Sequence, residues 1–177
     1  FEALIKDSAD AIAEAKKQVS DENSSDFHRA LIRNCQLNAE NVRIWSDDLI
    51  FVVDRIIRLN DGSVPSVFQN RLDTENMAVL GHSFGGAAAG QACLADSRFK
   101  AFINLDGTPF GDTVDNVIEQ PFMIICADPG QNAMLTPDSG YSQEQKDYLV
   151  VMIKGAKHMN FTDLSVILPH VGKAIGL

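Results

Sequence analysis

The stretch NMAVLGHSFGGAAAG, residues Asn76–Gly90, indicates how this chain folds. Its first residues, Asn76–Leu80, form a short apolar run that predicts a buried strand, and the small residues from Ala87 to Ala95 predict a helix. Residues 81–85 between them read Gly-His-Ser-Phe-Gly, the pattern G-x-S-x-G. A strand, a tight turn and a helix in this order predict a strained turn that exposes the serine hydroxyl above the sheet edge.

Ser83, at the centre of this pattern, is the candidate nucleophile. The flanking glycines remove the Cβ atoms that would clash where the strand and the helix approach each other. The start of the helix directs backbone N–H groups and a partial positive charge to the place where an oxyanion would form. We expect the backbone N–H of Phe84 to be the first donor of an oxyanion hole. We expect His82 to point away from Ser83 and to serve packing.

The candidate base is His158. A nucleophilic serine needs a histidine to accept its proton and an acid to orient that histidine. The usual chain order after such a turn is serine, acid, histidine, and the histidines downstream are His158 and His170. His158 follows a predicted strand, Tyr148–Lys154, and catalytic groups gather at the carboxyl ends of parallel strands. His170 falls inside a predicted closing helix, Asp163–Gly176, where a surface or capping role is expected.

Two aspartates compete for the role of the acid. Asp106 ends the predicted strand Phe99–Leu105, and Asp128 ends the predicted strand Pro121–Ala127. Both positions suit an acid at the carboxyl edge of a sheet, although an aspartate at a strand end also serves as a turn or cap residue. The spacing of the residues leaves the two candidates open.

The upstream part of the chain is predicted to be helical. An Ala-rich amphipathic helix is expected over Glu2–Val19, followed by the polar segment Ser20–Asp26. A second helical region runs from Phe27 to Leu59, either continuous or broken near Asn34–Asn38. The turn residues Asn60-Asp61-Gly62 end it.

From Asn76 onward apolar strands alternate with helices, which predicts an α/β fold with a mostly parallel sheet. A short helix is expected over Val114–Gln120, and Trp45 is expected in the core. The large apolar residues near the strands are expected in the core as well: Phe99, Phe102, Phe122, Met123 and Met152. Because every predicted strand follows residue 75, we interpret residues 1–177 as one domain holding the C-terminal half of a larger sheet.

Composition excludes several classes of protein. The chain has 177 residues, of which 45% are hydrophobic and 22% charged, as expected for one globular domain. Its net charge of −9 disfavours nucleic-acid binding. No apolar run reaches the roughly 18 residues of a membrane helix, and no motif for a metal or cofactor is found. Three separated cysteines, Cys35, Cys93 and Cys126, predict neither a disulfide framework nor a zinc site, and the sequence favours neither a secreted nor a cytoplasmic location.

Several segments resemble the plasma and intracellular type II platelet-activating factor acetylhydrolases, a family of serine esterases with the α/β-hydrolase fold. They are MAVLGHSFGG (77–86), DSRFKAFINLD (96–106), QPFMIIC (120–126), IKGAKHMNFTD (153–163) and the helical segment 32–60. The resemblance implies Asp106 as the acid beside Ser83 and His158. It also implies the first strands of the sheet and an upstream strand and loop that would carry a second oxyanion donor. On this resemblance we expect the N-terminal part of the protein to be missing from residues 1–177 and to act as a partner of this chain. The segment after Asp106, GTPFGD, is shorter than in the family and lacks its bulky aromatic residue, although Phe110 is a candidate wall of the acyl pocket.

The sequence therefore predicts a serine esterase or lipase-type hydrolase that cleaves a carboxylic ester, with a short-acyl phospholipid ester among the candidate substrates. Its predicted site is Ser83, Asp106 and His158 with the Phe84 N–H. One alternative is a cutinase-like or polyester-type esterase with Asp128 as the acid. The other is a non-catalytic protein of the α/β-hydrolase type. Neither a cofactor nor a metal is expected in any of the three.

Overall fold

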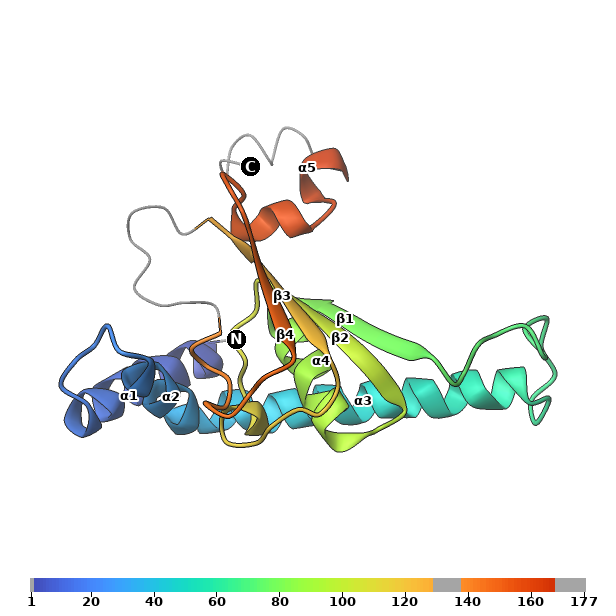
Figure 1. The fold of residues 1–177 in the computed structure, drawn as a ribbon, viewed down its shortest axis with the longest axis horizontal. Coiled ribbons are helices and arrows are strands. Elements are labelled where there is room, and N and C mark those ends of the chain that lie inside the picture. Colours follow the sequence, from blue (N-terminus) through green and yellow to red (C-terminus); the bar gives the residue numbers. More distant parts are fainter. Residues whose placement is uncertain (1, 129–137, 168–177) are drawn as a thin grey trace.

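Four parallel strands form one sheet in the order β1-β2-β3-β4 in the computed structural model, which describes residues 2–128 and 138–167 (Figure 1). The strands are β1 (Met77–His82), β2 (Phe99–Leu105), β3 (Phe122–Ala127) and β4 (Tyr148–Ile153). Each strand pairs with the next one along the chain, and every pairing is parallel. The predicted α/β fold with a parallel sheet is confirmed.

Helices cover one face of this sheet. The helices are α1 (Glu2–Gln18), α2 (Ser25–Asn34), α3 (Gln36–Asn60), α4 (Phe84–Ala95) and α5 (Leu164–Ile167), with short 3₁₀ helices η1 (Asp112–Val114) and η3 (His158–Phe161). α4 packs on β1 and β2, and the long α3 packs beside α4 (Figure 1), with Val53 of α3 buried in one cluster with Val79 of β1 and Phe99 of β2. The predicted break in the second helical region lies at Cys35. Of the predicted closing helix only Leu164–Ile167 is described, and His170 lies outside the described residues.

The core lies between the sheet and α4. The rings of Phe102 and Phe122 stack with their centroids 4.5 Å apart, and Phe99 is buried with them, as predicted. Small residues make α4 thin enough to approach the strands closely, and they are almost fully buried: Ala87, Ala88, Ala89 and Ala92.

Two residues predicted to lie in the core are exposed. Trp45 is 49% exposed and Met152 is 50% exposed. Trp45 lies on α3 beside the start of α4, where its ring meets the edge of Phe84 at a centroid distance of 5.1 Å. Met152 lies on β4, a strand at the end of the sheet, so it has a neighbouring strand on one side.

The prediction of a helix over Val114–Gln120 is wrong. The structure has the short 3₁₀ helix η1 ending at Val114 and an irregular segment after it. The side chain of Gln145 explains the difference, because its Oε1 accepts from the Ile118 N–H at 2.9 Å and its Nε2 donates to the Ile118 carbonyl at 2.8 Å. These bonds satisfy the backbone groups that a helix would have paired internally.

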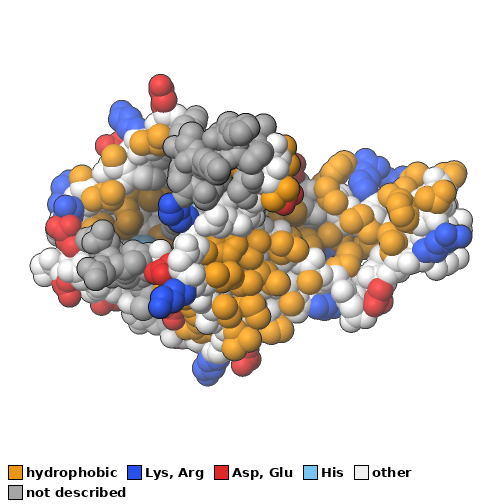
Figure 2. All heavy atoms as spheres, turned by 90° about the horizontal axis from the view of Figure 1, so that it is seen from above, with side chains coloured by type: hydrophobic (Ala, Val, Ile, Leu, Met, Phe, Trp, Pro, Cys, Tyr) orange, Lys and Arg blue, Asp and Glu red, His pale blue; other side chains and the backbone are white. Residues whose placement is uncertain are grey.

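The sheet face that points away from α4 carries exposed apolar side chains. Leu80 on β1 is 65% exposed, and on β4 the figure is 61% for Leu149 and 40% for Val151. The space-filling view from above shows a broad apolar surface beside the residues drawn in grey (Figure 2). No helix among the described residues is both long enough and apolar enough to cross a membrane.

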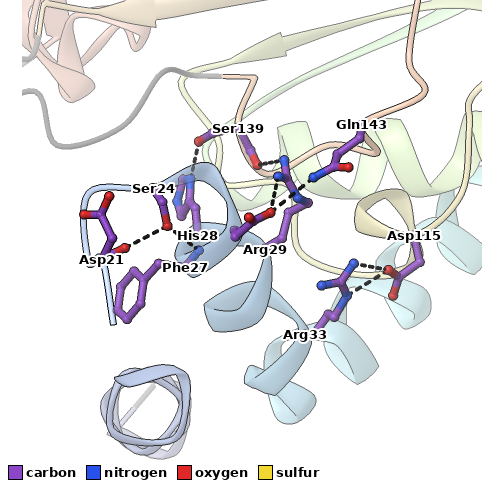
Figure 3. A network of polar contacts seen from close by, with 10 residues as sticks. Asp21, Ser24, Phe27, His28, Arg29, Arg33, Asp115, Ser139 and Gln143 are labelled. Atoms are coloured by element: carbon purple, nitrogen blue, oxygen red, sulfur yellow. Dashed lines mark hydrogen bonds and ion pairs between the residues drawn. The ribbon is translucent and has the colours of Figure 1, made fainter. Parts of the chain in front are cut away.

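Side chains of α2 bind the segment that begins at residue 138 (Figure 3). The buried guanidinium of Arg29 donates to the Ser139 carbonyl at 3.3 Å and pairs with Asp26 at 2.8 Å, and Asp26 also accepts from Gln143 at 3.2 Å. The ring Nδ1 of His28 lies in hydrogen-bond contact with the Ser139 hydroxyl. This network joins the N-terminal helices to the chain that leads into β4.

His28 predicts a loss of stability in mild acid. Burial, with a smaller effect of the neighbouring Arg29 charge, lowers the pKa of His28 from 6.5 to about 4. As the pH falls below 6.5 the unfolded chain takes up this proton while the folded chain does not, so the free energy of unfolding falls until about pH 4. The full effect is on the order of 3 kcal/mol. Urea unfolding at pH 7 and pH 4.5 measures it, and a His28→Gln variant that keeps the same pH dependence would contradict it.

Candidate active site

Ser83 occupies a strained turn between β1 and α4. Its φ and ψ are 57° and −124°, in a region that residues with a side chain seldom adopt. Hydrogen bonds hold this conformation, because the Ser83 N–H donates to the Leu105 carbonyl at 2.8 Å and the Gly86 N–H donates to the Ser83 carbonyl at 2.9 Å. The turn therefore lies against the end of β2, the strand paired with β1.

Ser83, His158 and Asp106 form a continuous line of hydrogen bonds. The Ser83 Oγ lies 3.0 Å from His158 Nε2, and Asp106 Oδ2 lies 2.7 Å from His158 Nδ1. A carboxylate only accepts, so Nδ1 carries the hydrogen and the neutral ring has Nε2 ready to accept from the serine hydroxyl. The three residues lie 23 or more positions apart in the chain and are brought together by β1, β2 and η3.

Two hydrogen bonds to the backbone of β3 hold the turn that carries Asp106. Asp106 has a positive φ of 54°, its N–H donates to the Ile125 carbonyl at 2.8 Å, and its Oδ1 accepts from the Ala127 N–H at 2.8 Å. These bonds to β3 leave Oδ2 directed at His158. The side chain is 19% exposed, so the carboxylate is largely screened from bulk water.

The buried side-chain amide of Asn104 stabilises this turn through hydrogen bonds to its backbone. Asn104 is completely buried, and its Oδ1 accepts from the Gly107 N–H at 2.9 Å while its Nδ2 donates to the Gly107 carbonyl at 2.8 Å. The same Nδ2 donates to the Tyr141 hydroxyl at 2.9 Å. Burial raises the pKa of Tyr141 well above its usual range, so the hydroxyl remains protonated. Sequence reasoning did not single out Asn104. It occupies a position of β2 whose side chain faces the core, where the alternation of the strand predicts an apolar residue.

Asp128 occupies a different place from Asp106. Its carboxylate accepts from the Gly155 N–H at 2.9 Å, and its own N–H donates to the Ala156 carbonyl at 2.9 Å. It thus binds the start of the segment that carries His158, named here the base loop (residues 154–162). Both ring nitrogens of His158 are already bonded, to Ser83 and to Asp106.

His82 differs from its predicted role as a packing residue. Its Nε2 lies 2.9 Å from the backbone carbonyl of His158, and the two imidazole rings have centroids 4.5 Å apart. The side chain does point away from Ser83, onto the base loop. A histidine at the variable position of the motif was the available signal, but sequence reasoning could not show what faced it.

Phe84 begins α4 directly after Ser83. The first N–H groups of a helix have no partner within the helix, so the Phe84 N–H belongs to the set available to an oxyanion. The ring of Phe84 lies 5.1 Å from that of Trp45 and 6.2 Å from that of Phe110, measured between centroids. These three rings, named here the aromatic wall, stand beside the serine turn.

The cysteines are poor competitors for the role of nucleophile. All three are free and buried. Burial raises the pKa of Cys35 to about 11 and that of Cys93 to about 12, and it also raises the pKa of Cys126, with a further contribution from the Asp106 charge. A thiol must ionise to attack, so these shifts keep the cysteines inert at neutral pH.

This parallel sheet, with a strained serine between a strand and a helix, is the fold of the α/β hydrolases. A family model described as platelet-activating factor acetylhydrolase, isoform II, matches residues 51–177. The chain belongs to this family.

Individual relatives agree with this assignment. The platelet-activating factor acetylhydrolase of Cavia porcellus is 37% identical over 108 residues, which are 59% of this chain and 24% of that protein. The protein of the same name from Canis lupus familiaris is 33% identical over 112 residues, 61% of this chain and 24% of its own length. The chain thus spans about a quarter of the length of these relatives.

A solved structure has the same fold. The ferulic acid esterase from Streptomyces cinnamoneus superposes with a TM-score of 0.61 at 27% sequence identity, covering 75% of this chain and 37% of the esterase.

Proposed function

We propose that this chain carries the acyl-transfer site of a serine ester hydrolase, with Ser83 as nucleophile, His158 as base and Asp106 as the acid that orients the base. The observation that supports this most directly is the line of hydrogen bonds from Ser83 Oγ to His158 at 3.0 Å and from His158 to Asp106 at 2.7 Å. The names of the relatives and of the structural neighbour, all ester-cleaving enzymes, support the same reaction class.

In this mechanism Ser83 Oγ attacks the ester carbonyl carbon as its proton passes to His158 Nε2. The carbonyl oxygen becomes an oxyanion, and the Phe84 N–H is the proposed donor to it. The bond to the alcohol oxygen then breaks, and the alcohol takes the proton from His158. A water molecule gives a proton to His158 and attacks the acyl group, after which the carboxylic acid leaves and Ser83 regains its proton. The negative charge of Asp106 stabilises the imidazolium of His158 both when Ser83 is acylated and when water releases the acyl group.

The proposed substrate is an ester with a short, apolar acyl group, such as the acetyl ester of a phospholipid. The name of the relatives indicates an acetyl ester, and the aromatic wall of Trp45, Phe84 and Phe110 supplies an apolar surface beside Ser83. The expected second oxyanion donor, upstream of this chain, stays a prediction.

Hydrolysis of a series of p-nitrophenyl esters tests the substrate class. We expect the acetyl ester to be cleaved with a higher kcat/KM than the octanoyl ester or a feruloyl ester, because the relatives are named for the cleavage of an acetyl ester. A Ser83→Ala variant, which lacks the hydroxyl and is checked for folding by circular dichroism, gives the background rate. Equal rates for wild type and Ser83→Ala would contradict the proposed reaction, and a preference for the feruloyl ester would contradict the proposed substrate.

A further inference from the structure

His82 faces the back of the base loop. On β1 the side chains alternate between the two faces of the sheet, so His82 lies on the face of Leu80 and away from α4. There its Nε2 lies 2.9 Å from the His158 carbonyl oxygen. A carbonyl only accepts, so His82 Nε2 carries the hydrogen and donates it.

The ring of His82 also packs against η3. Its centroid lies 4.5 Å from that of His158, with the planes inclined by 39°, and 6.1 Å from that of Phe161. Residues three apart in a 3₁₀ helix lie above one another, so His158 and Phe161 present one side of η3. His82 therefore contacts this side with its ring and the backbone with its N–H.

η3, which carries His158, lies at the surface of the described part of the chain. None of the four residues of η3 is buried. The hydrogen bonds at its start are local: the Lys157 N–H donates to Asn160 Oδ1 at 2.7 Å, and the Asn160 N–H donates to the Lys157 carbonyl at 2.9 Å. Asp128 binds the loop two and three residues before His158. Catalysis requires the base to be held within about 0.5 Å of its productive position. The hydrogen bond from His82 acts at His158 itself, whereas those of Asp128 act two and three residues earlier.

We propose that His82 is a positioning residue for the base: its N–H and its ring hold the His158 backbone so that the imidazole meets Ser83 and Asp106 together. This inference rests on the proposed function, since it assigns His158 the role of base. It gives the variable position of the G-x-S-x-G motif a task in this chain, which is to join the strand before the nucleophile to the loop that carries the base.

Three substitutions separate the two contacts. His82→Ala removes both the donor and the ring, His82→Gln keeps a donor near the position of Nε2, and His82→Phe keeps a ring without a donor. Leu80→Ala, on the same strand and face and two residues before His82, is the matched control. Each variant is compared with the wild-type chain by circular dichroism before it is assayed.

Two measurements are made on each variant. The first is the second-order rate of labelling by a fluorophosphonate, and the second is the downfield NMR resonance of the His158 Nδ1 proton shared with Asp106. We expect His82→Ala to slow labelling about 10–100-fold and to broaden or shift the resonance, because a small misplacement of a catalytic group has effects of that size. We expect His82→Gln to recover most of the rate and Leu80→Ala to match wild type.

A His82→Ala variant that labels at the wild-type rate and keeps the wild-type resonance overturns the inference. If His82→Ala fails to fold, the pair His82→Gln and His82→Phe decides, and equal rates in both with an unchanged resonance overturn it as well. Failure of the proposed function looks different: the wild-type chain itself is then not labelled at Ser83. In that case the resonance still shows whether His82 positions His158.

Discussion

Asp106→Asn is expected to lower the rate at which Ser83 reacts with a fluorophosphonate by about 10⁴-fold, the size of loss found when the orienting acid of a serine–histidine pair becomes an amide. Asp106 Oδ2 lies 2.7 Å from His158 Nδ1 and requires the hydrogen on that nitrogen. An asparagine can present its N–H₂ group there instead, which favours the ring tautomer with the hydrogen on Nε2. That tautomer cannot accept the proton of the Ser83 hydroxyl.

Asp128→Asn is the matched control for this prediction. Its carboxylate accepts from the Gly155 N–H at 2.9 Å, and an asparagine oxygen can accept the same bond. We therefore expect the labelling rate of Asp128→Asn to stay close to that of wild type. A large loss in Asp128→Asn with normal labelling in Asp106→Asn would transfer the role of acid to Asp128 and favour the cutinase-like alternative.

Gly81→Ala is expected to destabilise the fold by about 3 kcal/mol or more, at the upper end of what overpacking costs. A Cβ at Gly81 would lie 2.1 Å from the Gly85 carbonyl oxygen and 2.8 Å from the Gly86 nitrogen. Both are backbone atoms of the serine turn, so they cannot rotate aside as a side chain would. The strand and the helix would have to separate, and Ser83 would lose its position with them.

Gly85→Ala tests the same motif with the opposite expectation. A Cβ at Gly85 would meet no atom within 4 Å, and Gly85 lies in α4, where alanine is the better helix former. We expect no loss of stability in this variant. Urea unfolding of both variants measures the difference, and equal destabilisation by the two substitutions would show that the turn is not packed as described.

Much of the sheet could be predicted from sequence because the strands are short apolar runs bounded by turn residues. The predicted strand Phe99–Leu105 has the observed bounds of β2, and the serine turn lies between a strand and a helix as the motif indicates. Local residue patterns were sufficient here, since a buried parallel strand is a nearly continuous run of apolar residues.

Where prediction failed, contacts between distant parts of the chain decided the structure. Gln145 satisfies the backbone at Ile118 and leaves no helix there, and His158 faces His82 from 76 positions downstream. Trp45 lies on a helix whose apolar pattern is that of a core face, yet it is 49% exposed. A helical pattern shows which side of a helix is apolar but not which element covers it.

The choice between Asp106 and Asp128 shows how the order of the strands bears on the site. β2 pairs directly with β1, with Leu105 opposite His82, so Asp106 follows beside Ser83. Asp128 ends β3, one strand further from β1 and so about 5 Å further along the sheet. Spacing along the chain carries no information on this order, and for that reason the residues alone left both aspartates open.

The most direct test of the proposed site is mass mapping of the chain after reaction with a fluorophosphonate. We expect one adduct, on the peptide that contains Ser83, and its loss in Ser83→Ala and in His158→Ala, because the hydroxyl becomes a nucleophile only when His158 accepts its proton. A folded wild-type chain without an adduct on Ser83, or with the same adduct when His158 is replaced by alanine, would contradict a hydrolase site at Ser83.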